Sequence, residues 1–209
     1  DALLIGPGLG QEKETFDFIC NLLLFNNMES NQEKLGFSHS SKNKKQTRTH
    51  SQPPIVFDAD VLRNLASIED WHKLLEKVAV LTPHPGEMSA LTGLSIEEIQ
   101  KDREATAKKY AEKWGHVVVL KGAITVIAAP DGTTFFIPIA TPALATAGTG
   151  DVLAGMIVGL ISQGCSALNA AVAGAWFHAQ AGIAAEKNIG QNISVMAGDV
   201  VRQIPNALK

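Results

Sequence analysis

Short apolar runs alternate along the chain with longer segments that have the hydrophobic spacing of helices. The runs, which are typical of buried strands, occur at residues 2–5, 55–57, 78–81, 117–120 and 124–129. Each of the first three is followed by a turn rich in glycine, proline or acidic residues, and then by apolar residues spaced three and four apart. This order of strand, turn and helix predicts a three-layer α/β/α domain with a mostly parallel sheet.

The longer segments predict helices at residues 11–25, 95–114 and 167–185, with a short last helix that opens near residues 196–199. The first helix has an apolar face made of Phe18, Ile19, Leu22 and Leu23. A capping box of Ser95 and Glu98 begins the second. The third is rich in alanine and glycine, and we expect His178 in its middle to be a core or interface histidine with its hydrogen bonds satisfied. The turn PDGT predicts a hairpin between residues 124–129 and 134–137.

Between residues 26 and 54 the composition changes to asparagine, serine, glutamine, lysine and histidine. Such a segment buries too little apolar surface to offset the entropy lost on ordering, so we predict a flexible surface insertion with solvated basic residues. The whole chain, residues 1–209, reads as a single domain that contains this insertion. Because the chain opens directly on an apolar run, we expect this domain to be N-terminally truncated.

Composition narrows the range of partners. The chain has 209 residues, of which 45% are hydrophobic, with a formal net charge of −3 and a pI near 6.1. This balance argues against general binding to nucleic acid or to an anionic membrane. No signal peptide or apolar span of membrane length is visible, and the two cysteines have no metal-ligand or redox spacing. We therefore expect a cytoplasmic protein that acts on small molecules.

The most informative stretch is residues 145–155, which read ATAGTGDVLAG. A loop of small residues with two glycines runs straight into a helix that has Val152, Leu153 and Met156 on its apolar face. The first backbone N–H groups of a helix have no partner within it and carry the positive end of its dipole, while glycine lets a ligand approach closely. The loop therefore predicts a phosphate-binding site.

Asp151 lies inside this loop, where a carboxylate repels a bound phosphate. A base that takes a proton from an attacking hydroxyl is one reason for an acid at such a place. The alternative, which the loop by itself leaves open, is that Thr149 or Asp151 merely caps the helix.

Other charged or ligand-binding side chains follow the ends of other predicted strands. Asp58 and Asp60 come after a buried run, and they either hold a magnesium ion or a substrate hydroxyl or cap the next helix. His84 stands between two prolines in a stiff turn, which favours ligand binding. Lys121 ends a buried strand beside Gly122, and we expect its ammonium to reach a nucleotide phosphate rather than to lie on the surface.

Five motifs together resemble the ADP/ATP-dependent NAD(P)H-hydrate dehydratases of the ribokinase-like superfamily. They are GPGLG at residues 6–10, FDAD at 57–60, TPHPGE at 82–87, LKGAIT at 120–125 and LATAGTGDVL at 144–153. They occur in the family's order and span nearly the whole chain apart from the insertion. The family's usual first βα region has no counterpart before Asp1, and residues 139–142 (IATP) stand where the family has an asparagine-containing loop.

The resemblance implies repair of the hydrated cofactors NADHX and NADPHX to NADH and NADPH, with ADP or ATP as phosphoryl donor and Mg²⁺ bridging the phosphates. It implies that Asp151 is the catalytic base and that Gly8, His84 and Asp151 bind the substrate. It also implies a set of nucleotide-binding residues, namely Lys121, Gly122, Ala123, Ile124, Thr125, Ala147, Gly148, Thr149 and Gly150. No dedicated metal ligands are identified. We also expect a homo-oligomer.

Two other functions are considered. One is a ribokinase-like kinase that phosphorylates a hydroxymethyl group on a vitamin precursor, and the other is an inactive fragment that binds nucleotide. The turn that holds His84 and the Lys-Gly-x-x-Thr motif favour the dehydratase.

Overall fold

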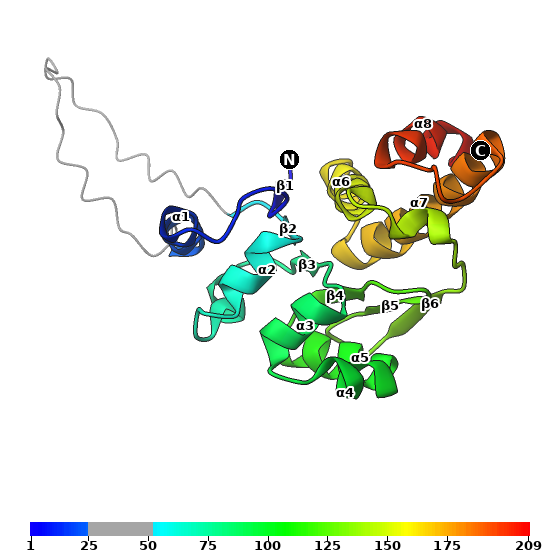
Figure 1. Cartoon of the computed structure of the whole chain (residues 1–209). Coiled ribbons are helices and arrows are strands. Elements are labelled where there is room, and N and C mark those ends of the chain that lie inside the picture. Colours follow the sequence, from blue (N-terminus) through cyan, green and yellow to red (C-terminus); the bar gives the residue numbers. More distant parts are fainter. Residues whose placement is uncertain (25–51) are drawn as a thin grey trace, which may run out of the picture.

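The computed structural model describes residues 1–24 and 52–209 (Figure 1). Its strands are β1 (Leu3–Ile5), β2 (Ile55–Phe57), β3 (Val80–Leu81), β4 (Val117–Leu120), β5 (Thr125–Ala128) and β6 (Thr134–Ile137). Its α-helices are α1 (Lys13–Leu24), α2 (Asp60–Leu65), α3 (Pro85–Thr92), α4 (Ile96–Lys101), α5 (Arg103–Trp114), α6 (Thr149–Ser162), α7 (Ala167–Ile189) and α8 (Ala197–Ala207). Two short 3₁₀ helices are η1 (Trp71–Leu74) and η2 (Pro142–Ala145).

The strands of the described residues form one mixed sheet in the chain order β1 to β6. The pairs from β1 to β4 are parallel, whereas β4–β5 and β5–β6 are antiparallel. Crossovers between parallel strands are almost always right-handed, so a sheet built in chain order places its crossover helices on one face. Helices α1 to α5 accordingly cover one face, and α6 and α7 cover the other (Figure 1). The predicted three layers, mostly parallel sheet and hairpin are confirmed.

The sheet separates two hydrophobic cores. In β4, Val118 and Leu120 pack toward α1 to α5, while Val117 and Val119 pack toward α6 and α7. Both faces of this strand are covered, which explains why its sequence is an unbroken apolar run. A third, smaller core joins α8 to α7. None of the helices in the described segments has both the length and the apolar character needed to cross a membrane.

The predicted single helix over residues 95–114 is wrong, because the chain breaks it into α4 and α5 at Asp102. Asp102 has φ −148° and ψ 84°, and its Oδ1 accepts a hydrogen bond from the N–H of Ala105 at 2.9 Å. It therefore acts as the N-cap of α5. Between Ile99 and the next buried positions, Thr106 and Ala107, residues 100–104 are all polar, and this gap in the apolar spacing was the available sign of the break. The capping box of Ser95 and Glu98 is confirmed at the start of α4.

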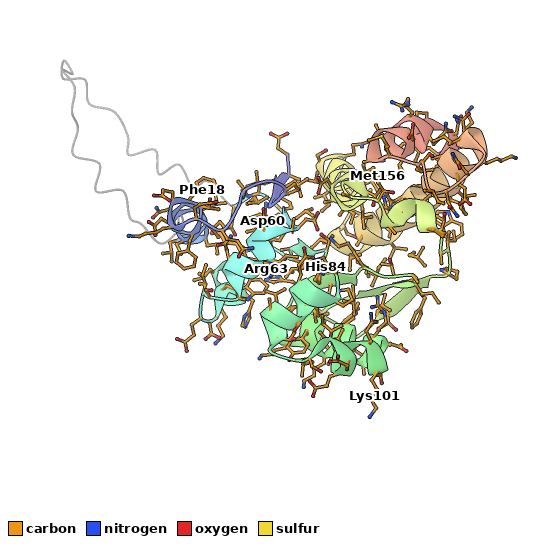
Figure 2. All side chains as sticks on the ribbon, in the orientation of Figure 1. Phe18, Asp60, Arg63, His84, Lys101 and Met156 are labelled. Atoms are coloured by element: carbon orange, nitrogen blue, oxygen red, sulfur yellow. The ribbon has the colours of Figure 1, made fainter. Side chains whose placement is uncertain are left out.

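Three expectations about the first part of the chain need correction. Helix α1 buries Ile19 and Leu23, but Phe18 is 52% exposed because it lies about 100° around the helix from Ile19 (Figure 2). Strand β1 is only half buried, since among the described strands it pairs with β2 alone. The predicted flexible insertion lies outside the described residues except for positions 52–54. There Gln52 is buried and exchanges two hydrogen bonds with Glu76, so this end of the predicted segment is fixed.

Candidate active site

The carboxyl ends of β2, β3 and β4 meet at one edge of the sheet, because these strands are parallel neighbours. The start of α3, the β4–β5 turn, η2 and the start of α6 enclose a cavity of about 750 Å³ there. Open α/β sheets usually bind ligands at this edge. Among the residues predicted to bind or react, those lining the cavity are His84, Lys121, Gly122, Ala123, Thr125, Ala147, Gly148, Thr149, Gly150 and Asp151.

The predicted phosphate loop has the backbone of an anion site. Gly148 is the N-cap of α6, with φ 85° and no side-chain cap. The hydroxyl of Thr149 donates to the carbonyl oxygens of Leu144 and Thr146, at 2.7 and 2.8 Å, instead of capping the helix. Within the described residues, the N–H groups of Gly150 and Asp151 donate to no acceptor. The helix start is therefore open to an anion.

Asp151 occupies the first turn of α6 and is exposed at the cavity wall. Its carboxylate makes no hydrogen bond or ion pair with any residue of the described ranges. The alternative that Asp151 or Thr149 caps α6 is therefore wrong. A carboxylate without a protein partner keeps its lone pairs available to take a proton from a bound hydroxyl.

Behind the loop, a buried ion pair fixes the predicted nucleotide lysine. Lys121 Nζ lies 2.7 Å from Asp58 Oδ1 and 3.7 Å from Glu87 Oε2, and both carboxylates are buried. Asp58 Oδ1 also accepts a hydrogen bond from the hydroxyl of Thr82 at 2.6 Å. A Cβ on Gly150 would lie 3.5 Å from Lys121 Nζ, so the ammonium is directly beside the phosphate loop. Lys121 is not a surface residue, and its ammonium lies beside the open start of α6.

Asp58 and Asp60 were each considered either as a ligand for magnesium or a substrate hydroxyl or as a helix cap, and the structure places the two residues differently. Neither caps α2, whose N-cap is Ala59 without a side-chain hydrogen bond. Asp60 Oδ2 instead accepts from the N–H of Gly10 at 2.9 Å and anchors the glycine turn after β1. Asp58 alone of the pair lines the cavity.

His84 both caps a helix and faces the cavity. Its Nδ1 accepts from the N–H groups of Gly86 and Glu87 at 3.0 and 3.2 Å, and Glu87 Oε2 accepts from the N–H of His84 at 2.8 Å. This capping box starts α3. Because Nδ1 is an acceptor, Nε2 carries the proton of the neutral ring, 3.3 Å from Glu87 Oε1. The imidazole is about half exposed, so its outer edge remains available to a ligand.

Two predicted site residues are not in the cavity wall. Gly8 lies in the turn after β1, and Ile124 points its side chain to the surface, 49% exposed. The turn approaches the site only through Gly6, where an added Cβ would fall 1.6 Å from the carbonyl oxygen of Asp58. The substrate role of Gly8 and the nucleotide role of Ile124 stay predictions.

Sequence reasoning missed the far wall of the cavity. This wall is apolar and comes from β6, η2 and α7, through Ile137, Ile139, Leu144, Ala175 and Ala179. His178 belongs to it and is buried, but its Nε2 has no hydrogen-bond partner in the described residues. The expectation of a fully satisfied histidine is therefore wrong. The spacing of Ala175, His178 and Ala179 on one helix face was the available signal.

The cavity holds more negative than positive side chains. Its carboxylates are Asp58, Glu87 and Asp151, and its one lysine or arginine is Lys121, which leaves a formal charge of −2 with both histidines neutral. The described residues bring no group of three or more potential metal ligands together. The two buried carboxylates already share Lys121. The described residues thus do not form a metal site of their own.

The order and arrangement of strands and helices are those of the ribokinase-like fold. A ribokinase-like superfamily protein from Enterococcus faecalis has the same fold, with a TM-score of 0.74 at 23% identity, over 99% of this chain and 62% of that chain. The chain belongs to the NAD(P)H-hydrate dehydratase family, whose model matches residues 1–206.

Relatives and solved structures agree with this assignment. A bifunctional NAD(P)H-hydrate repair enzyme Nnr from Moorella thermoacetica is 41% identical over 211 residues, covering 100% of this chain and 34% of the relative. An ADP-dependent (S)-NAD(P)H-hydrate dehydratase from Neisseria meningitidis serogroup B is 38% identical over 153 residues, covering 72% of this chain and 52% of the relative. An ADP/ATP-dependent NAD(P)H-hydrate dehydratase from Bacillus subtilis, crystallised with ATP and Mg²⁺, has a TM-score of 0.75 at 29% identity, covering 99% of this chain and 63% of that chain. The chain therefore spans about a third to a half of the length of these two curated relatives.

Burial of His178 predicts a pH dependence of stability. Burial lowers the pKa of this histidine to about 4, with the nearby charge of Lys121 acting in the same direction and a hydrogen bond to the Thr149 backbone opposing it. Below pH 6.5 His178 becomes protonated in the unfolded chain, whereas in the folded chain it stays neutral down to about pH 4. The free energy of unfolding therefore falls as the pH drops from 6.5 to 4. The loss from this residue approaches about 3 kcal/mol at pH 4.

Denaturant unfolding of the wild type and His178→Gln between pH 7 and pH 4 checks this prediction. The wild type should lose more stability on acidification than the variant. The pKa of His116 is also lowered, mainly by burial, but His116 is present in both proteins. Its contribution to the pH dependence therefore cancels in the comparison. Equal pH slopes would show that His178 does not stay neutral in the folded protein.

Proposed function

We propose that this chain carries out ADP- or ATP-dependent dehydration of NADHX and NADPHX to NADH and NADPH. The observation that carries the proposal is the unpaired carboxylate of Asp151 at the open N-terminus of α6. An acid beside free N–H groups combines a proton acceptor with an anion site. Membership of the NAD(P)H-hydrate dehydratase family supports the choice of substrate.

In the proposed reaction, Asp151 takes the proton of the ring hydroxyl as its oxygen attacks the terminal phosphorus of the nucleotide. The new P–O bond forms while the bond from that phosphorus to the rest of the nucleotide breaks. The N–H groups of Gly150 and Asp151 stabilise charge on the transferring group. The ring nitrogen's lone pair then expels phosphate, and loss of a proton from the neighbouring carbon restores the double bond. Hydroxide, a poor leaving group, is thus replaced by phosphate.

The proposal assigns the predicted site residues to two ligands. We assign Lys121, Gly122, Ala123, Ile124, Thr125, Ala147, Gly148, Thr149 and Gly150 to the nucleotide, and Gly8, His84 and Asp151 to the hydrate. The ion pair with Asp58 supports this assignment, because it holds the ammonium of Lys121 next to the phosphate loop before any ligand binds.

Magnesium enters the proposal with the nucleotide. The surplus of carboxylates in the cavity opposes a polyphosphate, and a divalent cation on the phosphates removes most of that repulsion. The Bacillus subtilis relative was crystallised with ATP and Mg²⁺. We therefore place Mg²⁺ on the nucleotide rather than in a site formed by the protein.

The proposed activity is tested by mixing the purified protein with NADHX and following the absorbance of the reduced nicotinamide. ADP and ATP are added in separate cuvettes, each with and without Mg²⁺. We expect recovery of NADH that depends on a nucleotide and on Mg²⁺, and the more active cuvette identifies the donor. Nucleotide binding without recovery would contradict the dehydratase and leave a kinase or an inactive nucleotide-binding protein.

For the base, we predict that Asp151→Asn lowers kcat by about a hundredfold or more while the variant folds and binds nucleotide. The amide keeps the size of the side chain but accepts no proton at neutral pH. Asp17→Asn on the exposed side of α1 is the matched control and should leave turnover unchanged. Near-normal turnover of Asp151→Asn would exclude this residue as the base.

We also propose that the protein is a cytoplasmic homo-oligomer. Free Cys20 and Cys165 fit a reducing compartment. For self-association the support is a group of half-exposed aromatic side chains, Phe135 and Phe136 on the outer strand β6 and Trp176 on α7. We expect light scattering to give a multiple of the chain mass, and Phe136→Ser to reduce it. A monomer at all concentrations would contradict the proposal.

A further inference from the structure

The break between α4 and α5 places an arginine against the nucleotide loop. Because Asp102 ends one helix and caps the next, Arg103 becomes the first residue of α5, beside the carboxyl end of β4. Helix α5 packs against both β4 and β5. The Arg103 side chain is half buried, although it is not part of the cavity wall. It therefore reaches the β4–β5 turn from outside the cavity wall.

The guanidinium of Arg103 closes this turn at both ends. Its Nη2 donates to the carbonyl oxygen of Leu120 at 2.9 Å and to that of Ile124 at 3.3 Å. Its Nη1 donates to Gln100 Oε1 at 3.0 Å, and this bond holds the planar guanidinium in position. One charged group thus joins the residue before the turn to the last residue of the turn, and hydrogen bonds from a charged donor are stronger than neutral ones.

Gly122 gives a second, independent sign of this contact. A Cβ at Gly122 would lie 2.6 Å from Arg103 Nη2 and 2.9 Å from Cζ. The backbone of Gly122 is not in the left-handed region, so conformation alone does not require glycine there. What a side chain at this position would displace is the guanidinium, together with its hydrogen bonds to the turn.

We propose that Arg103 is a positioning residue for the nucleotide: it fixes the Lys121–Ile124 turn in the shape that receives the phosphates and base of ADP or ATP. This inference rests on the proposed function for the identity of the ligand. The N–H of Lys121 donates to the carbonyl oxygen of Pro83 at 2.8 Å, so the turn is held from β3 as well as from α5. Arg103 itself touches neither substrate nor reacting atoms, and its loss weakens nucleotide binding rather than the chemical step.

The test is a double-mutant cycle on Arg103 and Gly122, with binding of ADP and Mg²⁺ measured by calorimetry. We expect Arg103→Ala to raise the Kd about tenfold, because a charged hydrogen bond to each end of the turn is lost. Gly122→Ala should raise it by a similar factor in the wild type but by less than about twofold in Arg103→Ala, since its effect acts through the guanidinium. Additive effects of the two substitutions would overturn the inference.

Three further measurements separate positioning from a general loss of structure. In steady-state assays Arg103→Ala should raise the KM for nucleotide with kcat nearly constant, and free guanidinium ion should restore part of the binding. Arg103→Lys should not restore it fully, because a single ammonium cannot reproduce the planar fork. Arg63→Ala, which removes an exposed arginine from α2, is the matched control and should leave the Kd unchanged. An unchanged Kd in a folded Arg103→Ala would refute the proposal.

Backbone order parameters from nitrogen relaxation distinguish this proposal from the proposed function. In the ligand-free protein, Arg103→Ala should lower the order parameters of Gly122, Ala123 and Ile124. If the wild type binds no nucleotide, the proposed function fails, while unchanged order parameters would show that Arg103 does not hold the turn.

Discussion

The buried ion pair between Lys121 and Asp58 ties together the ends of three strands. Asp58 follows β2, Thr82 and Glu87 follow β3, and Lys121 follows β4, and all their polar atoms meet within hydrogen-bond or ion-pair distance. Each of these side chains would be costly to bury alone, so the cluster is stable only when the register of the parallel strands is correct. The site geometry and the fold are therefore specified by the same contacts.

This cluster also sets the electrostatics of the cavity. Lys121 is shared between two buried carboxylates, so its charge is largely compensated before a ligand arrives. The phosphate loop contributes backbone N–H groups and the dipole of α6 rather than further cations. A bound polyphosphate would therefore meet free N–H donors in a cavity whose formal charge is −2, which is the physical reason for proposing a cation carried by the nucleotide.

The sequence predicts well those features that depend on neighbouring residues. The strand, turn and helix order, the glycine-rich loop before α6 and the location of His84 at a strand end are local patterns, and the structure confirms each of these placements. The sequence predicts less well the contacts between residues that are far apart in the chain. Asp58 and Lys121 are 63 positions apart, and no spacing rule pairs them before the register of β2, β3 and β4 is known. The unpaired nitrogen of His178 also depends on packing against other elements. The break at Asp102, by contrast, is a local cap that the prediction overlooked.

The partners of the three cavity carboxylates also determine which of them can act as a base. Asp58 accepts from Thr82 and Lys121, and Glu87 accepts from the N–H of His84 and lies near Lys121. These contacts occupy oxygens of both carboxylates and hold the two side chains in place. Asp151 has neither kind of partner in the described residues, and it lies beside the open N–H groups. Three carboxylates of one cavity thus differ in their partners, partly because of where β4 places its lysine, and this difference is what supports Asp151 as the proposed base.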